Sequence, residues 1–160
     1  MRQDPQDLDH FWMREALKLA DQAGSESEVP VGALLVREGR SIAQAWNQSI
    51  RRSDPTAHAE MLVLRHAAEH LQNYRLPHTT LYVTLEPCCM CAGALVHARV
   101  ERLVFGAYDL KSGAVATHYH LLEGAPSNHR IAVTAGILAT ECAHLLTTFF
   151  KERRKACSRF

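Results

Sequence analysis

The sequence predicts a three-layer α/β fold, in which helices flank a mixed five-stranded sheet. Two short apolar runs on either side of a glycine-containing turn predict a β-hairpin early in the chain. Later apolar runs alternate with helical patterns, which is typical of strands joined by crossover helices. The length of 160 residues suits a single domain, 1–160, with a core of its own.

The first part of the chain is predicted to form a helix and then the hairpin. Residues 9–23 place apolar side chains at helical spacing, and Gly24 follows as a stop signal. The hairpin strands are expected at 32–37 and 41–46, with the turn at 38–40. The remaining elements are expected in this order: a helix at 57–64, a strand at 79–84, a helix that begins at Pro87, strands at 102–106 and 131–134, and a long terminal helix from about Gly136.

The composition is that of an ordinary globular protein. Hydrophobic residues make up 47% of the chain and charged residues 22%. The sequence has no apolar run of membrane-spanning length and no apolar signal core, so we expect a cytoplasmic protein without membrane contact. Five cysteines are an odd number, which favours reduced thiols over a disulfide framework. The net charge of +1 is too small to indicate a nucleic-acid partner by itself.

The most informative pattern is a histidine and a glutamate two residues apart, followed by a P-C-C-M-C run. Structural zinc sites fill all four tetrahedral positions with Cys or His, whereas catalytic sites use three protein ligands and leave the fourth to water. His58, Cys88 and Cys91 supply three such ligands, and Glu60 is a spare carboxylate. The pattern therefore predicts one Zn²⁺ per chain in a catalytic site.

Spacing indicates which of these groups bind the ion. Cys88 and Cys91 are three apart and share a face on a helix, whereas the rival pair Cys89 and Cys91, two apart, would point apart. We therefore favour Cys88 with Cys91. His58 and Glu60 are also two apart, so the easier geometry is one ligand and one non-ligand, with Glu60 as the catalytic proton carrier. The sequence has no H-E-x-x-H pattern around Glu60, which argues against a metalloprotease.

Further segments accompany these motifs and together resemble one family. They are V-P-V-G-A at 29–33, W-N at 46–47, D-P-T-A-H-A-E at 54–60, Q-N-Y-R-L at 72–76, L-Y-V-T-L-E-P-C at 81–88, V-F-G-A at 104–107 and N-H-R at 128–130. H-x-E followed by P-C-x-x-C is the signature of zinc-dependent nucleobase deaminases. Over nearly its whole length the chain resembles the bacterial tRNA-specific adenosine deaminases, which convert the wobble adenosine of an anticodon to inosine. The resemblance implies the cytidine-deaminase-like fold, a hydrolase that releases ammonia, a homodimer, and a tRNA anticodon loop rather than a DNA duplex as partner.

The resemblance also implies residues that lie near the bound nucleotide. Asn47 can present a donor and an acceptor to a purine edge, although an asparagine there could instead close a turn. Asp109 and Asn128 match positions near the nucleotide, and a loop-closing or capping role is an equal alternative for both. Phe149 and Phe150 fit stacking on unpaired bases, and core packing is the alternative for at least one of them.

The end of the chain is basic. Residues 151–160 contain five basic side chains against Glu152, among them Arg153 and Arg154. They are expected either to meet RNA phosphates or to form the solvated end of a helix. Two other functions fit the sequence: deamination of a free nucleobase or nucleoside such as guanine or cytosine, and a non-catalytic zinc-stabilised RNA-binding module, which would not need Glu60.

Overall fold

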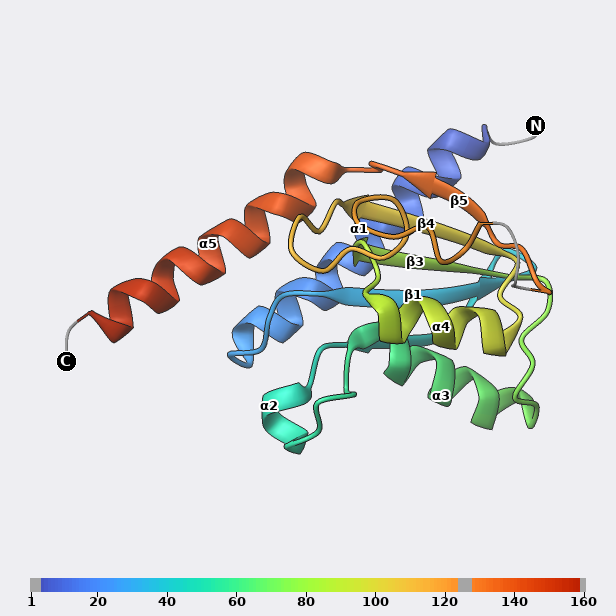
Figure 1. Ribbon diagram of the computed structural model, residues 1–160, viewed down its shortest axis with the longest axis horizontal. Coiled ribbons are helices and arrows are strands. Elements are labelled where there is room, and N and C mark those ends of the chain that lie inside the picture. The colour runs from blue at the N-terminus through green and yellow to red at the C-terminus, as the bar shows by residue number, and fades with distance from the viewer. Residues whose placement is uncertain (1–3, 124–127, 159–160) are drawn as a thin grey trace.

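The computed structural model of the protein describes residues 4–123 and 128–158, and its centre is a mixed five-stranded sheet (Figure 1). The strands are β1 (Gly32–Arg37), β2 (Arg40–Trp46), β3 (Thr79–Leu85), β4 (Arg102–Ala107) and β5 (Ala132–Ala135). Their order in the sheet is β2-β1-β3-β4-β5. β1 is antiparallel to β2 and β3, whereas β3, β4 and β5 run parallel. The mixed sheet predicted from the sequence is therefore confirmed.

Helices cover both faces of this sheet. The helices of the described residues are α1 (Pro5–Ser25), α2 (Ser49–Arg52), α3 (Ala59–Leu71), α4 (Cys89–Ala98) and α5 (Ala139–Cys157). α1 and α5 pack on one face, and α3 and α4 lie side by side on the other (Figure 1). This confirms the predicted three layers, while the short α2 is an element that the sequence reasoning misses. Within the described ranges, no helix combines the length and apolar character that crossing a membrane requires.

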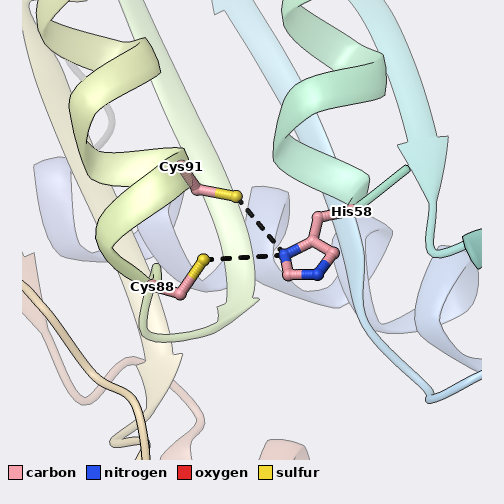
Figure 2. A group of neighbouring side chains, drawn as sticks. All are labelled: His58, Cys88 and Cys91. Atoms are coloured by element: carbon pink, nitrogen blue, oxygen red, sulfur yellow. Dashed lines mark hydrogen bonds between the residues drawn. The ribbon is translucent and has the colours of Figure 1, made fainter. Parts of the chain in front are cut away.

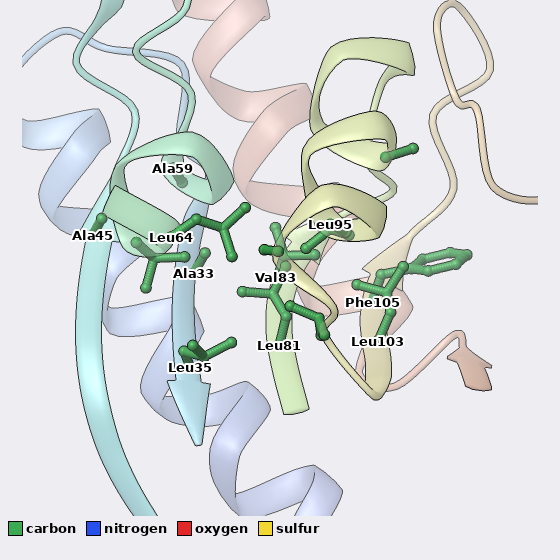
Figure 3. Close-up of a cluster of buried hydrophobic side chains, with 14 of the residues drawn as sticks. Ala33, Leu35, Ala45, Ala59, Leu64, Leu81, Val83, Leu95, Leu103 and Phe105 are labelled. Carbon is green, nitrogen blue, oxygen red and sulfur yellow. The ribbon is translucent and has the colours of Figure 1, made fainter. Parts of the chain in front are cut away.

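Alternating side chains of the strands fill a core on each face. Leu34 and Val36 pack on the α1 side, where they meet Met13. Ala33 and Leu35 belong to the larger cluster beneath α3 and α4 (Figure 3). Because both faces of β1 are covered, this strand is apolar along its length rather than alternating between apolar and polar residues.

Two helix boundaries differ from the prediction for local reasons. α1 begins earlier than expected, at Pro5, because the Asp4 side chain accepts a hydrogen bond from the Gln6 N–H and proline is favoured at the first helical position. α5 begins later than expected because the backbones of Gly136 and Leu138 are left-handed, with φ of 82° and 53°. Such a backbone interrupts a right-handed helix.

The directions of the strands bring three chain segments to one edge of the sheet. β2, β3 and β4 point the same way, so their carboxyl ends lie at the same edge. Asn47 follows β2, Cys88 follows β3 and Asp109 follows β4. This edge is where ligands usually bind in α/β folds. The topology therefore gathers three of the predicted site residues.

α5 is attached to the sheet close to its start. Cys142 is 1% exposed and is the one buried residue of this helix among those described. Its sulfur lies against Gly106 on β4, where an added Cβ would come within 2.4 Å of it. Farther along, α5 extends away from the sheet (Figure 1). Cys142 is thus buried, whereas Cys157 at the far end of the helix is exposed.

Gly32→Ala should destabilise the fold because α1 lies directly against the backbone of β1 at this glycine. An alanine Cβ would lie 2.2 Å from the Ala16 carbonyl oxygen and 2.4 Å from the Ala20 nitrogen. Overpacking of this kind should lower the free energy of unfolding, measured in urea, by about 1–3 kcal/mol. The control is Gly24→Ala, where the new Cβ would meet Pro30 at 3.6 Å, an ordinary contact. Equal losses in the two variants would contradict this account.

Candidate metal centre

Two of the predicted zinc ligands occupy the N-cap positions of neighbouring helices. His58 precedes α3 and Cys88 precedes α4, and both have extended backbones, with ψ of 152° and 176°. An N-cap side chain usually accepts a hydrogen bond from the first helical turn, but neither side chain does so here. Both are therefore available to a ligand. Pro87, predicted to open α4, lies before the N-cap instead, because the extended backbone of Cys88 delays the first helical residue to Cys89.

The third ligand completes a compact group. Cys91 lies in the first turn of α4, and its sulfur points toward the His58 ring (Figure 2). His58 Nδ1 is 3.7 Å from Cys88 Sγ and 3.6 Å from Cys91 Sγ. A tetrahedral zinc ion with ordinary Zn–N and Zn–S bond lengths requires an N···S separation of about 3.6 Å. The three side chains therefore fit a zinc ion, while Cys89 is exposed and lies outside the group.

Hydrogen bonding within this group favours a thiolate at Cys88. The hydrogen bonds from Cys91 and then from His58 lower the pKa of the Cys88 thiol to about 4. The contact with Cys88 raises the pKa of the Cys91 thiol and also that of the His58 ring. Zinc binds thiolates and neutral imidazole, so metal binding at this group would release protons.

Glu60 is buried beside the three ligands. It lies in the first turn of α3, two residues after His58, and is 4% exposed. Burial raises the pKa of its carboxyl to about 7, and the same carboxyl interacts with His58 and Cys91. Glu60 thus adjoins the group without belonging to the set of ligand atoms that lie within 4.8 Å of one another. This is the placement expected for a proton carrier rather than a ligand.

Asn47 accepts a hydrogen bond at the start of α3, where the His58 side chain accepts none. Its Oδ1 accepts from the Ala59 N–H at 2.8 Å, so the Asn47 side chain satisfies the first turn of α3. This bond fixes the orientation of the amide and uses its oxygen, not the two N–H groups on Nδ2. A structural role and a substrate role are therefore compatible in this side chain.

The fold brings Asp109 to the same edge of the sheet as the metal group but places Asn128 elsewhere. Asp109 Oδ1 accepts from two backbone N–H groups of its own loop, at 3.0 and 3.2 Å, so the loop-closing role is observed. Asn128 Oδ1 accepts from Arg99 at 2.8 Å. Arg99 is the C-cap of α4, at the opposite end of this helix from Cys88. Within this chain, Asn128 therefore does not adjoin the metal group.

A groove of about 390 Å³ opens at the same edge, between the loop after β4 and α5. Its lining includes Tyr108, Leu110 and Phe150, which are 50%, 78% and 42% exposed. Three large apolar side chains are thus exposed around one groove, at the edge of the sheet that also carries the metal group. Phe149 is half-buried and meets Phe150 edge-on, with ring centroids 5.4 Å apart, and the Arg153 guanidinium lies over the Phe149 ring. Neither phenylalanine is a core residue.

The sequence matches proteins of known type. Residues 6–107 match the cytidine and deoxycytidylate deaminase zinc-binding region. The chain is 53% identical over 150 residues to the tRNA-specific adenosine deaminase of Haemophilus influenzae, which covers 93% of this chain and 87% of that protein. The chain belongs to the family of tRNA-specific adenosine deaminases. The matched region includes all three ligands and Glu60, so zinc is the metal that this deaminase holds.

Two solved structures extend the comparison. One, from work on A-to-I editing by tRNA:A34 deaminases at the wobble position of transfer RNA, aligns with this deaminase at a TM-score of 0.82 and 45% identity, over 85% of this chain and 99% of that chain. The other, guanine deaminase from Bacillus subtilis, aligns at a TM-score of 0.60 and 35% identity, over 61% of this chain and 63% of that chain. The predicted cytidine-deaminase-like fold is confirmed.

Sequence reasoning misses two buried glutamates that shape this site. Glu28 and Glu86 are each 2% exposed. Glu28 accepts from the backbone N–H groups of Ile50 and Arg51 in α2, and so fixes the segment that leads to His58. Glu86 accepts from the loop after β4. A charged residue directly between an apolar strand and the P-C-x-x-C motif is the signal that could have identified Glu86.

Cys91→Ala should lose zinc and stability together, because the energy of metal binding contributes to folding. Cys89→Ala is the matched control, and it should retain both, since this thiol is exposed and outside the group. The measurements are zinc per chain by atomic absorption and unfolding in urea. Zinc lost from the Cys89 variant, or kept in a Cys88→Ala variant, would show that the ligand assignment is wrong.

Proposed function

We propose that this deaminase hydrolyses the wobble adenosine of a tRNA anticodon to inosine and releases ammonia. The observation that carries the proposal is the compact group of His58, Cys88 and Cys91 with the buried carboxylate of Glu60 beside it. A structural zinc site would not need Glu60. The adenosine substrate is supported by the high identity to tRNA-specific adenosine deaminases along most of the chain.

The three ligands would hold zinc, which when bound lowers the pKa of a water molecule from 15.7 to about 7 and so supplies the nucleophile. Glu60 takes one proton from the attacking water and delivers it to the ring nitrogen next to the reacting carbon. The water oxygen bonds to that carbon. Glu60 then takes the second proton of the former water from the hydroxyl on that carbon and passes it to the exocyclic amine as the carbon–nitrogen bond breaks, so that ammonia leaves and a carbonyl remains.

The remaining residues of this edge would bind and orient the nucleotide. The Nδ2 donors of Asn47 suit an acceptor on the purine edge, and Asp109 keeps the loop after β4 in place. Tyr108 and Phe150 expose rings on which unpaired bases can stack. A duplex would keep its bases out of such a site, whereas an anticodon loop can turn one base outward. A loop of RNA therefore fits this edge better than a DNA duplex.

A free nucleobase is the alternative substrate. The similarity to a guanine deaminase is the reason to test free bases beside the RNA. The features that distinguish the two substrates lie on α5. Phe150 lines the groove, and Lys151, Arg153 and Arg154 follow it along the helix. Arg159, also part of the basic tail in the sequence, lies outside the described residues. A site for a small free base would need neither feature.

Assembly as a homodimer and residence in the cytoplasm belong to the same proposal. Both are implied by the resemblance to the bacterial tRNA enzymes, whose substrate is a cytoplasmic RNA. Light scattering of the purified protein tests the dimer, since it gives the mass of the particle directly. A mass that corresponds to one chain of 17.9 kDa at all concentrations would contradict it.

The experiment that tests the function is incubation with an anticodon stem-loop, followed by nucleoside analysis. Inosine should appear at the wobble position with one ammonia released for each inosine. Guanine, cytosine and adenine are assayed in parallel. Robust ammonia release from a free base, with no inosine in the stem-loop, would replace this proposal with the free-base alternative.

Glu60→Gln should keep zinc and fold but lose turnover, because the amide has the size of the carboxyl and cannot carry the proton. Positioned acid–base catalysis contributes about 10²–10⁴-fold, so the single-turnover rate should fall by that factor. Zinc content and the urea midpoint serve as controls for the metal site. A variant that forms inosine at nearly the wild-type rate would eliminate this role.

Neutralising Lys151 and Arg154 together should weaken stem-loop binding. Each lost phosphate contact should reduce the slope of log affinity against log salt by about 0.7, the value for a single strand. Turnover at saturating RNA should change little, since these contacts hold substrate and transition state alike. The charge-matched control replaces Arg37 and Arg40, at the β1–β2 turn. Equal salt slopes in all three proteins would remove α5 from the RNA interface.

A further inference from the structure

Glu86 is a buried carboxylate that receives five hydrogen bonds from one loop. Its Oε1 accepts from the backbone N–H groups of Val115, Ala116 and Thr117, at 3.2, 2.7 and 2.9 Å. Its Oε2 accepts from the backbone N–H of Asp109 at 3.0 Å and from the Thr117 hydroxyl. All five donors are uncharged and lie between residues 109 and 117. The loop after β4 is thus folded around a single side chain.

The backbone of this loop is shaped to admit the carboxylate. Gly113 lies so close that a Cβ there would come within 2.4 Å of Glu86 Oε2. The Ala114 N–H donates to the Pro87 carbonyl at 2.9 Å, which ties the loop to the segment that leads into α4. Cys88 directly follows Pro87, so this hydrogen bond joins the loop to the residue next to a metal ligand.

The other side of the same loop forms a wall of the groove. Tyr108, Asp109 and Leu110 line the groove opposite Phe150. Asp109 therefore belongs both to the groove wall and to the contact with Glu86. Its backbone N–H donates to Glu86, and its side chain accepts from the Ser112 N–H in the same loop. The conformation of this wall depends on the acceptor beneath it.

We infer that Glu86 is a positioning residue, which holds the 109–117 loop so that its first residues, 109–112, form the substrate-binding wall of the groove. The inference rests on the proposed function, because it takes the groove to be where RNA flanking the target base lies. Glu86 acts through the loop and touches neither the metal nor the reacting base. Its loss should therefore weaken substrate binding rather than slow the chemical step.

The test compares Glu86→Gln with wild type. The amide keeps the size of the side chain and one acceptor oxygen, but presents N–H groups where Oε2 now accepts from Asp109 and Thr117. We expect KM for the anticodon stem-loop to rise about tenfold, the factor that corresponds to one lost hydrogen bond to a charged acceptor. Zinc content should be unchanged, and kcat should stay within about twofold, since the wall binds ground state and transition state alike.

A matched pair of substitutions keeps the test valid if Glu86→Gln does not fold. Thr117→Val removes one of the five donors and should raise KM, whereas Thr117→Ser keeps the hydroxyl and should restore it. Tyr82→Phe is the control for a purely structural loss. It removes a buried hydrogen bond to Asp9 in the α1 layer and should lower stability without changing KM. Unchanged KM in Thr117→Val, or a fall in kcat at constant KM, would overturn the inference.

Hydrogen exchange separates this inference from the proposed function, because it needs no substrate. The backbone amides of residues 109 and 115–117 should exchange faster in Glu86→Gln and Thr117→Val than in wild type and Thr117→Ser. Equal protection in all four proteins would refute the positioning role. Failure of the wild-type protein to form inosine would instead refute the proposed function, and the exchange result would still decide the role of Glu86.

Discussion

The common direction of β2, β3 and β4 is the constraint on which the site depends. All three strands end at the same edge of the sheet. Residues that are far apart in the sequence therefore lie close together there, without a long connecting loop. α3 and α4 then begin side by side, which places His58 and Cys88 opposite each other. Cys91 joins them because it lies in the first turn of α4, three residues after Cys88. Reversing a single strand would carry one of these groups to the other end of the molecule.

The local physics of helix starts explains why these positions suit a metal. A residue at an N-cap has a backbone that is still extended, so its side chain projects beyond the helix end rather than along its surface. Leaving such a position uncapped costs about 1 kcal/mol. Asn47 offsets that cost for α3 by bonding to the Ala59 N–H from outside the helix. His58 can therefore bind a metal ion with little loss in the stability of the fold.

Residue types and their spacing predicted most of the fold and the metal centre, since zinc ligands and helical periodicity leave direct marks on a sequence. The spacing of three residues favours Cys88 over Cys89 as the partner of Cys91, and the structure places Cys88, at the N-cap, in the group and Cys89 outside it. The roles of Glu28 and Glu86 could not be predicted in this way, because their partners are backbone N–H groups, which every sequence carries. Asn128 is a different case: the motif match predicts a position near the nucleotide, which stays a prediction, and within this chain its side chain accepts a hydrogen bond from Arg99. Long-range placement is set by the loops between elements, and short motifs do not encode it.

Because α5 is held to the sheet near its start, at Cys142, a small tilt there displaces the far end of the helix most. The contact that holds it is the one between Cys142 and Gly106. Arg154 lies twelve residues farther along the helix than Cys142, a distance of about 18 Å along the helix axis. A tilt of α5 by only about 5° about Cys142 would move Arg154 by about 1.6 Å, more than half the length of a hydrogen bond. Phe150, at an intermediate distance, would move less. One small rotation would thus change the width of the groove and the reach of the basic side chains in a fixed ratio, so that the proposed contacts with a base and with its flanking phosphates would change together.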